Sequence, residues 1–332
     1  MKLMVINEKL ISSSFYRAHG IFNDLCQQMK DLQIIDMAGK GYTWADILQA
    51  DAVYLHSPYS DEHSNLILYL KEMNKPVWVD YDDDLFHVPD DNPMWFLYSN
   101  LRTQENIKTI IQLANQVSVS TASLANVIQK LNKNTWVIPN AYNNEILNFR
   151  REPKRNQVVV WRGSNTHEVD LMVYADAIAE ITNKADTWKW VYLGYHPWFI
   201  RAAVTNPFER MVSLPITDPI WYYKKLRDLN ASCMQVPLAD NIFNHCKSNI
   251  AWIEGTYAGC VCLVPEWEEW NHPGAITYKD TKDYGDKLKL ITEGAFDLTK
   301  QVMQSYRFIQ ENFALYKINR IRMQLLKKMM EL

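Results

Sequence analysis

The chain has 332 residues, which is enough for about two domains, and 48% of them are hydrophobic and 22% are charged. A composition of this kind supplies apolar side chains for sizeable cores and excludes a disordered protein. The formal net charge of −3 also excludes a uniformly basic protein that coats nucleic acid, although it leaves room for a local basic groove.

The cysteines and the hydropathy pattern indicate where the protein works. The five cysteines form an odd set without the spacing typical of zinc sites, which favours a reducing compartment over a disulfide framework. The longest purely apolar runs are strand-sized, far short of the ~20 residues that a membrane helix requires. Residues 1–6 are typical of a strand and not of a signal peptide. We therefore expect a cytoplasmic protein without a transmembrane segment.

Short apolar runs typical of β-strands alternate with amphipathic segments of helical length along almost the whole chain. With helical spacers of about 10–15 residues, this alternation predicts βαβ units and parallel sheets that are covered on both faces. The expected strands cover residues 3–6, 33–37, 52–56, 77–81, 117–120, 136–139, 158–162, 190–193, 212–215, 233–236 and 261–265.

The alternation restarts after a polar, charged stretch, residues 143–157, which we interpret as a linker between two domains. The first domain then covers residues 1–142 and the second covers residues 158–296, while residues 297–332 form a helical region that packs back across both domains. The predicted fold class is α/β, with two Rossmann-like domains that face each other across a cleft. Ligands of such sheets bind at the carboxyl ends of the strands.

The second domain opens with a buried strand, a glycine and a helix start. Gly163 lets a backbone approach a ligand closely, and Arg162 can bind phosphate oxygens in a bidentate fork. This turn, which continues into Ser164, occupies the position where a doubly wound fold places its phosphate loop. Asn165 and Glu168 have the layout of a capping box, for which a purely structural role is sufficient.

The most informative segment extends from Pro237 to Gly259. We expect one helix that begins near Asn244 and places Asn244, Lys247 and Glu254 on one face. A lysine in the first turn opposes the helix dipole, but an anion at the helix N-terminus would reverse the sign of that effect. The alternative is an exposed lysine and an exposed glutamate that pair with other surface charges.

These residues resemble a known family. The run Pro-Leu-x-Asp-Asn-x-Phe-Asn-x-x-Lys-Ser at residues 237–248, together with Glu254, is similar to the donor-binding region of retaining GT-B glycosyltransferases of the family 4 type. Residues 137–142, Val-Ile-Pro-Asn-Ala-Tyr, resemble the Ile-Pro-Asn-Gly segment that closes the first domain of these enzymes. The pair Tyr16-Arg17, after the first strand, resembles an element of their N-terminal loop.

The resemblance implies an enzyme that moves a sugar from a nucleoside-diphosphate sugar, such as a UDP-sugar, to an acceptor hydroxyl with retention of anomeric configuration. Arg162 and Lys247 would neutralise the departing diphosphate, so that no cofactor would be required; a bound divalent metal is the alternative. Glu254 would accept hydrogen bonds from the ribose hydroxyls. The implied donor-binding set also contains Gly163, Ser164, Asn244 and Ser248.

The chain departs from the family at one position. The family has a glutamate eight residues before the ribose-binding one, and here that position is Cys246, so the usual pair of acids is incomplete. Asp240, in the preceding loop, is a candidate substitute close to the sugar; alternatively, it caps the loop. The missing acid also leaves open a non-catalytic module that binds nucleotide-sugars.

Four acids, Asp80, Asp82, Asp83 and Asp84, lie at the end of one strand of the first domain and in the loop after it. In one interpretation they orient the acceptor, with Asp83 as a base for its hydroxyl. In a second they bind a divalent ion, because Asp82 and Asp84 match the D-x-D motif of metal-dependent glycosyltransferases. In a third they form a solvated turn and a helix start.

On the acceptor side we expect Tyr16, Arg17, His56, Asp82 and Asp84, with a structural histidine as the alternative for His56. The acceptor itself is a glycan, a lipid-linked saccharide or a hydroxylated DNA base. A DNA acceptor would need a flipped-out base, and the basic cluster at residues 150–155 would follow its phosphate backbone. Solvated linker charges explain that cluster more simply.

Overall fold

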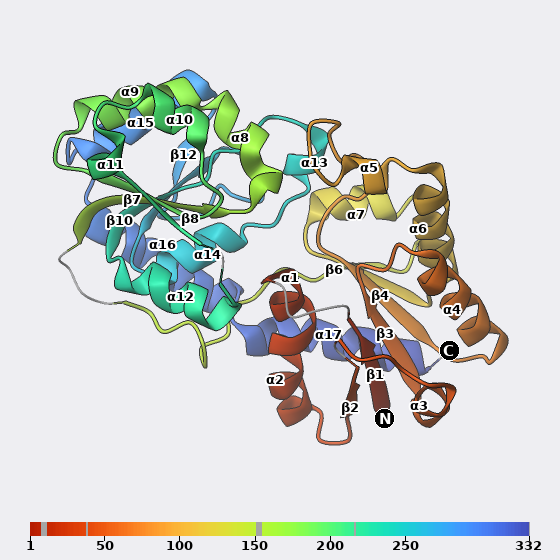
Figure 1. Cartoon of the computed structure of the whole chain (residues 1–332). Coiled ribbons are helices and arrows are strands. Elements are labelled where there is room, and N and C mark those ends of the chain that lie inside the picture. Colours follow the sequence, from red (N-terminus) through yellow and green to blue (C-terminus); the bar gives the residue numbers. More distant parts are fainter. Residues whose placement is uncertain (8–11, 38, 151–154, 216, 332) are drawn as a thin grey trace.

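The computed structural model describes residues 1–7, 12–37, 39–150, 155–215 and 217–331. They form two parallel six-stranded sheets, one in each half of the chain, with helices on both faces of each sheet (Figure 1). The expected α/β class with two Rossmann-like halves is confirmed.

The first sheet has the strand order β2-β1-β3-β4-β5-β6, with parallel pairing throughout. Its strands are β1 (Lys2–Ile6), β2 (Gln33–Asp36), β3 (Ala52–His56), β4 (Val77–Tyr81), β5 (Gln116–Val119) and β6 (Thr135–Val137). Its helical elements are α1 (Ser12–Ser14), the π-helix η1 (Phe15–His19), α2 (Gly20–Gln28), α3 (Trp44–Gln49), α4 (Asp61–Glu72), α5 (Trp95–Tyr98), α6 (Leu101–Leu113) and α7 (Ala122–Ile128).

The second sheet has the order β12-β11-β10-β7-β8-β9, again with parallel pairing. Its strands are β7 (Asn156–Gly163), β8 (Lys189–Gly194), β9 (Met211–Leu214), β10 (Ala231–Gln235), β11 (Val261–Pro265) and β12 (Ile276–Tyr278). Its helical elements are η2 (Asn165–His167), α8 (Glu168–Val173), α9 (Ala175–Lys184), α10 (Trp198–Ala203), α11 (Pro207–Arg210), α12 (Pro219–Asp228), α13 (Ile242–His245), α14 (Ile250–Tyr257) and α15 (Thr281–Thr292).

Alternation along the strands gives each sheet two buried faces. In β1, Met4 joins the hydrophobic cluster on one face, whereas Leu3 and Val5 join the cluster on the other face. In β7, Val160 and Val159 divide between two clusters in the same way. This is the period of two that a strand imposes, and strands buried on both faces explain the continuous apolar runs of the sequence.

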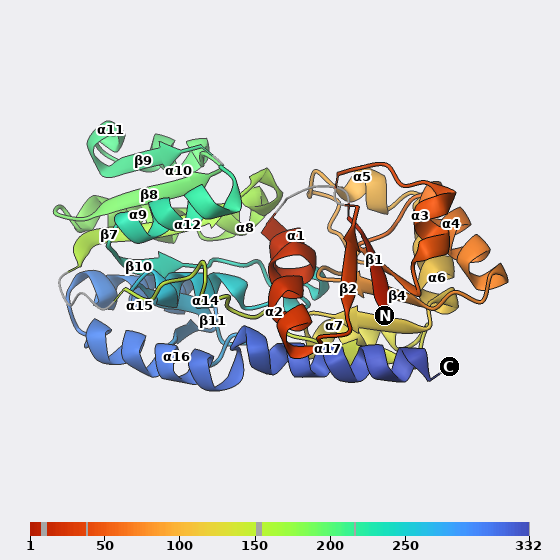
Figure 2. The same ribbon diagram turned by 90° about the horizontal axis from the view of Figure 1, so that it is seen from below.

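The last two helices, α16 (Leu298–Asn312) and α17 (Leu315–Met330), run end to end beneath both halves (Figure 2). Ile309 of α16 packs into a core cluster of the second half, and Leu326 of α17 packs into a core cluster of the first. Where they meet, Tyr142 donates its N–H to the Phe313 carbonyl at 3.0 Å and accepts from the Leu315 N–H at 3.1 Å. The chain therefore crosses between the halves twice at one place.

In the described part of the chain, no helix is long and apolar enough to cross a membrane. All five cysteines carry free thiols, and four of them are buried.

Candidate functional site

A cavity of about 670 Å³ lies between the two sheets at the carboxyl ends of their strands. Gly163 at the end of β7 and Pro237 after β10 line it from the second half. Asp82 after β4 and Asn140 after β6 line it from the first half. Its position is the one that the parallel topology predicts for a ligand site, and its volume falls within the range of about 300–1,000 Å³ common for ligand pockets.

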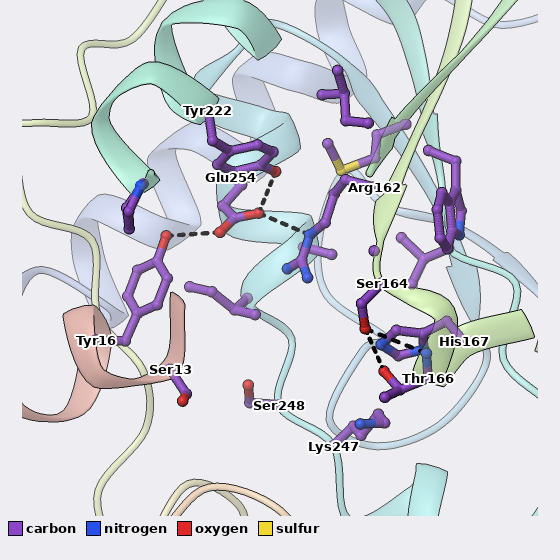
Figure 3. A pocket seen from close by; sticks show the side chains of 18 of the residues that line it. Ser13, Tyr16, Arg162, Ser164, Thr166, His167, Tyr222, Lys247, Ser248 and Glu254 are labelled. Atoms are coloured by element: carbon purple, nitrogen blue, oxygen red, sulfur yellow. Dashed lines mark hydrogen bonds and ion pairs between the residues drawn. The ribbon is translucent and has the colours of Figure 1, made fainter. Parts of the chain in front are cut away.

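Glu254 is the most heavily bonded carboxylate of this cavity (Figure 3). It is 3% exposed and lies on α14, and the Arg162 Nε is 3.0 Å from its Oε2. Its Oε2 also accepts a hydrogen bond from the Tyr222 hydroxyl at 2.7 Å. Its Oε1 accepts from the Tyr16 hydroxyl at 2.8 Å and from the Tyr223 hydroxyl at 3.3 Å. Both oxygens of Glu254 thus have protein partners.

Arg162 remains a cation suited to a phosphate. Burial acts to lower the pKa of Arg162, but the charge of Glu254 and the neighbouring Tyr222 outweigh it and raise that pKa. The ion pair uses the Nε atom, and the guanidinium of Arg162 lines the cavity between Glu254 and Ser164 (Figure 3). The terminal nitrogens of the fork are the ones that can meet phosphate oxygens.

The expectation of one helix from Asn244 through Glu254 is wrong. The structure has the short α13, which ends at His245, and the separate α14, which begins at Ile250. The break arises because Cys246 is drawn into the core of the first half, where its carbonyl accepts a hydrogen bond from the Thr121 hydroxyl at 2.9 Å. Asn244, Lys247 and Glu254 therefore do not share a helix face.

Lys247 lies in the break between the two helices and still reaches the cavity. Its Nζ is 3.1 Å from Asp83 Oδ1 of the first half and 4.3 Å from the centre of the Phe243 ring. Its side chain is 15% exposed. Arg162 and Lys247, from separate stretches of the chain, thus line a single cavity.

The N-terminus of α14 opens onto the same space. Ser248, Ile250 and Ala251 line the cavity, and the N-cap residue Asn249 makes no side-chain capping bond. Free N–H groups in a first helical turn, next to a lysine and an arginine, form a favourable environment for an anion.

The turn after β7 brings backbone close to the cavity. A Cβ on Gly163 would lie 2.7 Å from Trp161 Cζ2, so the glycine is required by packing against that ring. Ser164 caps η2 and accepts a hydrogen bond from the Thr166 N–H. The cap of this element is therefore Ser164, and the proposed capping box of Asn165 and Glu168 is not formed. Gly163, Ser164 and Thr166 all line the cavity.

The four acids of the first half have different environments. Asp80 is buried and pairs with Arg17, whose Nη2 and Nε lie 2.6 Å and 2.9 Å from its two oxygens. Asp84 is fully buried; its Oδ1 accepts from the Phe86 N–H and its Oδ2 lies 2.7 Å from His87 Nδ1. Only Asp82 and Asp83 of the four line the cavity. Asp84 is thus turned away from the site, so the D-x-D pair cannot act together there.

Asp82 is held as a carboxylate. Burial alone would raise its pKa, but the interaction with His56 and the charge of the more distant Arg17 outweigh burial and lower the pKa to about 2. Its Oδ1 accepts from the Ser57 hydroxyl at 3.2 Å and lies 3.7 Å from His56 Nε2. In the described residues, no three His, Cys, Asp or Glu side chains gather as a metal-ligand group.

Five predicted site residues lie outside the lining of this cavity: Asp84, described above, His56, which lines a smaller adjoining cavity, and Arg17, Asn244 and Asp240. Arg17 is 1% exposed, and its guanidinium donates to the Ile138 carbonyl and the Asn140 side chain as well as to Asp80. Arg17 therefore joins η1 to the first sheet and is not placed to contact an acceptor. Asn244 is buried and donates to Asp170 at 2.6 Å. Asp240 has a side chain that is 84% exposed and lies 2.7 Å from His245 Nε2.

The basic linker cluster is only partly within the described residues, because Arg151 and Lys154 lie outside them. Arg150 donates to the Arg227 carbonyl at 2.5 Å, and Arg155 donates to the Gly259 carbonyl at 2.6 Å. These two arginines therefore bind the second half of the chain itself.

Tyr222 and Tyr223 are site residues that the sequence analysis missed. Both project from α12 onto Glu254, which lies 32 residues after Tyr222 and 31 residues after Tyr223. The sequence signal for these residues was a pair of adjacent tyrosines shortly after the Pro-x-Thr-Asp-Pro sequence of residues 215–219. Only the fold shows which carboxylate the two tyrosines contact.

No protein-family model and no curated protein matches the chain. Solved structures do match it. HepE from Anabaena, in complex with UDP and glucose, superposes with a TM-score of 0.68 at 10% identity over 98% of this chain and 99% of that one. A UDP-forming α,α-trehalose-phosphate synthase from Burkholderia vietnamiensis gives 0.66 at 9% identity over the whole of both chains.

A point mutant of TarM from S. aureus, in complex with fondaparinux, α-GlcNAc-glycerol and UDP, gives a TM-score of 0.62 at 13% identity. The match covers 85% of this chain and 57% of that one. Together, these likenesses confirm that the chain has the GT-B fold, as its sequence resemblance implies.

Proposed function

We propose that this protein is a glycosyltransferase that moves a sugar from a nucleoside-diphosphate sugar to an acceptor hydroxyl. The observation that carries the proposal is that Arg162, Lys247, the Gly163–Ser164 turn and the N-terminus of α14 line one cavity at the strand ends of the second sheet. Each of these features binds phosphate by general chemistry, and together they match a diphosphate. A uridine nucleotide is the favoured donor, since HepE and TarM were crystallised with UDP.

The charges of the site fit the step that the reaction requires. The bond between the anomeric carbon and the β-phosphate oxygen breaks, and a new bond forms between that carbon and the acceptor oxygen. Negative charge grows on the leaving diphosphate, so fixed cations stabilise the transition state more than the bound donor. Arg162 and Lys247 supply this role.

Asp83 is the base that we assign to the acceptor hydroxyl. Its side chain is 43% exposed at the cavity and its Oδ1 pairs with Lys247 at 3.1 Å. A diphosphate that draws Lys247 toward itself frees the Asp83 carboxylate to accept the hydroxyl proton. Donor binding would in this way prepare the base.

Two finer features belong to the same proposal. Transfer retains the anomeric configuration, as the resemblance of residues 237–248 to retaining enzymes suggests. No divalent metal is required, because the two side-chain cations neutralise the diphosphate. The free thiols support a reducing, cytoplasmic setting.

The test is a thermal-shift screen of the full chain against UDP, GDP, ADP and their hexose conjugates, followed by an assay for release of the nucleoside diphosphate. We expect one nucleotide to raise the melting temperature, since a ligand that binds only the folded state stabilises it. The activity should withstand EDTA. Activity that EDTA abolishes and Mn²⁺ restores would instead favour a metal-dependent transferase. Donor binding without turnover would favour a non-catalytic module, and salt-sensitive DNA binding a DNA-base acceptor.

A further inference from the structure

A second cavity, of about 230 Å³, adjoins the first on the side of the first sheet. The two share Ser13, Asp82, Asp83, Thr166 and Lys247 in their linings. A group in the second cavity therefore approaches the same aspartates and lysine as a donor in the first. Its volume is below that of pockets for drug-sized ligands, so it suits a group about the size of one sugar ring.

The polar side of the second cavity is acidic. Among its described lining residues, Lys247 is the only lysine or arginine, and it already pairs with Asp83. Asp82, with its pKa lowered, keeps a full negative charge at neutral pH. The lining thus contains two carboxylates against one ammonium. The donor cavity differs, because Arg162 and Lys225 also line it.

His56 adds an unused polar atom. Its side chain is 4% exposed, and its Nδ1 is 3.3 Å from Asn7 Oδ1. Its Nε2 is buried without a hydrogen-bond partner, 3.7 Å from Asp82 Oδ1. A buried nitrogen of this kind costs free energy unless a ligand or water completes it. A hydroxyl group that bonds to Asp82 therefore lies close to a nitrogen that has no hydrogen bond of its own.

The remaining wall is apolar and aromatic. Its apolar and aromatic residues are Tyr59, Leu85, Val88, Met94, Tyr98 and Phe243, and uncharged polar residues such as Ser57 and Asn92 complete the lining. Two apolar residues close in sequence to this wall are strongly exposed. Phe96 of α5, between Met94 and Tyr98, is 80% exposed, and Ile242 of α13, next to Phe243, is 60% exposed.

We propose that this cavity selects an acceptor whose entering group is an uncharged, hydroxyl-bearing ring attached to an apolar substituent, and that it rejects phosphorylated sugars. The proposal rests on the proposed glycosyltransferase function and specifies its acceptor. Hydroxyl groups donate to Asp82 and Asp83 and meet His56 Nε2. The apolar ring face and substituent pack on the aromatic wall. Among the described lining residues, a phosphate there meets two carboxylates and a single ammonium, Lys247, which already pairs with Asp83, so the phosphate is repelled.

The test measures binding and transfer with matched probes. p-Nitrophenyl hexosides form one arm and the corresponding hexose 6-phosphates form the other, each added to the full chain in the presence of saturating UDP or of the donor found in the nucleotide screen. We expect a p-nitrophenyl hexoside to raise the melting temperature further and to accept sugar, with kcat/KM at least about tenfold above that of the phosphate. A hexose 6-phosphate that binds or reacts better, or failure of both arms to bind, overturns the proposal.

Two substitutions that change the charge of the cavity, and one control, test the acceptor preference further. Met94→Arg adds a cation to the wall and should improve use of the hexose 6-phosphate by about fivefold or more, whereas Met94→Leu should leave the preference unchanged. Asp82→Asn removes one carboxylate and should likewise reduce the preference for the p-nitrophenyl hexoside over the hexose 6-phosphate. UDP binding reports whether this variant is folded. Absence of nucleotide binding in the unaltered protein would refute the proposed function itself, whereas nucleotide binding with a preference for phosphorylated acceptors refutes the acceptor class alone.

Discussion

The Tyr16 hydroxyl of the first half donates a hydrogen bond of 2.8 Å to Glu254 of the second half, across 238 residues of sequence. The same Glu254 oxygen accepts from Tyr223, which lies within the second half, at 3.3 Å. Phe15 and Tyr16 also pack on the Tyr223 ring, with centroids 6.0 Å and 6.4 Å apart. The carboxylate that pairs with Arg162 therefore also joins the two halves, and under the proposed function this contact would couple donor binding to closure of the cleft.

Removal of the Tyr16 hydroxyl should weaken the closure of the cleft between the two halves of the chain. Tyr16→Phe keeps the ring but loses a buried hydrogen bond to a charged group, so we expect a loss of about 1–2 kcal/mol in unfolding free energy. With a less tightly closed cleft, water should compete better with the acceptor, and the ratio of donor hydrolysis to sugar transfer should rise. Product analysis with an isotope-labelled donor measures that ratio.

Tyr223→Phe is the matched control for this effect. It removes a hydroxyl from the same Glu254 oxygen, but from within the second half. It should lower stability without raising the hydrolysis ratio. An equal rise in both variants would show that Tyr16 acts only on Glu254 and not on closure.

Lys247→Ala should affect turnover much more than folding. The Lys247–Asp83 pair is part-exposed, so its loss should cost at most about 1 kcal/mol of stability. Loss of a cation at the leaving group should lower kcat about 100-fold or more. Lys247→Arg should recover part of the activity, and Lys224→Ala, on the exposed side of α12, should behave like the unaltered protein. An unimpaired Lys247→Ala enzyme would contradict the proposed role.

The sequence predicts the strands well because each is a continuous apolar run that both faces of a sheet bury. The strand β12, Ile276–Tyr278, is missed because its three residues alternate Ile-Thr-Tyr and form no continuous apolar run. The site is predicted less well, since its geometry depends on contacts between distant segments. Cys246 breaks the expected helix by entering the core of the other half, and Arg17 is buried by Asp80, 63 residues away. Helical periodicity carries no signal for either contact.

Glu269 should make stability depend on pH. Burial raises its pKa to about 8, against a partial opposing effect of the Asn249 N–H, which donates to its Oε1 at 3.4 Å. Between its ordinary pKa of 4.5 and about 8, the folded protein holds a proton that the unfolded chain has lost. The contribution of Glu269 to the free energy of unfolding is therefore fully present below pH 4.5. It falls by about 1.4 kcal/mol per pH unit up to pH 8.

Glu269→Gln resembles the protonated form and should remove this slope. Chemical denaturation at pH 5, 7 and 9 should show the variant close to the unaltered protein at pH 5 and more stable at pH 9. Glu268→Gln, at the exposed neighbouring position, should leave most of the slope in place, because the charge of Glu268 raises the Glu269 pKa less than burial does. A Glu269→Gln protein that is less stable at pH 9 would mean that the carboxylate is needed in its charged form at the start of α14.

Replacing Cys246 with glutamate, the residue at this position in the family that the sequence resembles, should harm this protein. The Cys246 thiol is 2% exposed, and its Sγ lies 3.7 Å from Asp84 Oδ2; burial, reinforced by Asp84, raises its pKa to about 12. Cys246→Glu would place a second carboxylate beside the buried Asp84, at a cost of roughly 3 kcal/mol or more. The smaller Cys246→Ser change should cost less. Melting temperatures and turnover of both variants check the expectation, and a Cys246→Glu enzyme with unchanged stability and faster transfer would show that this position faces the donor sugar after all.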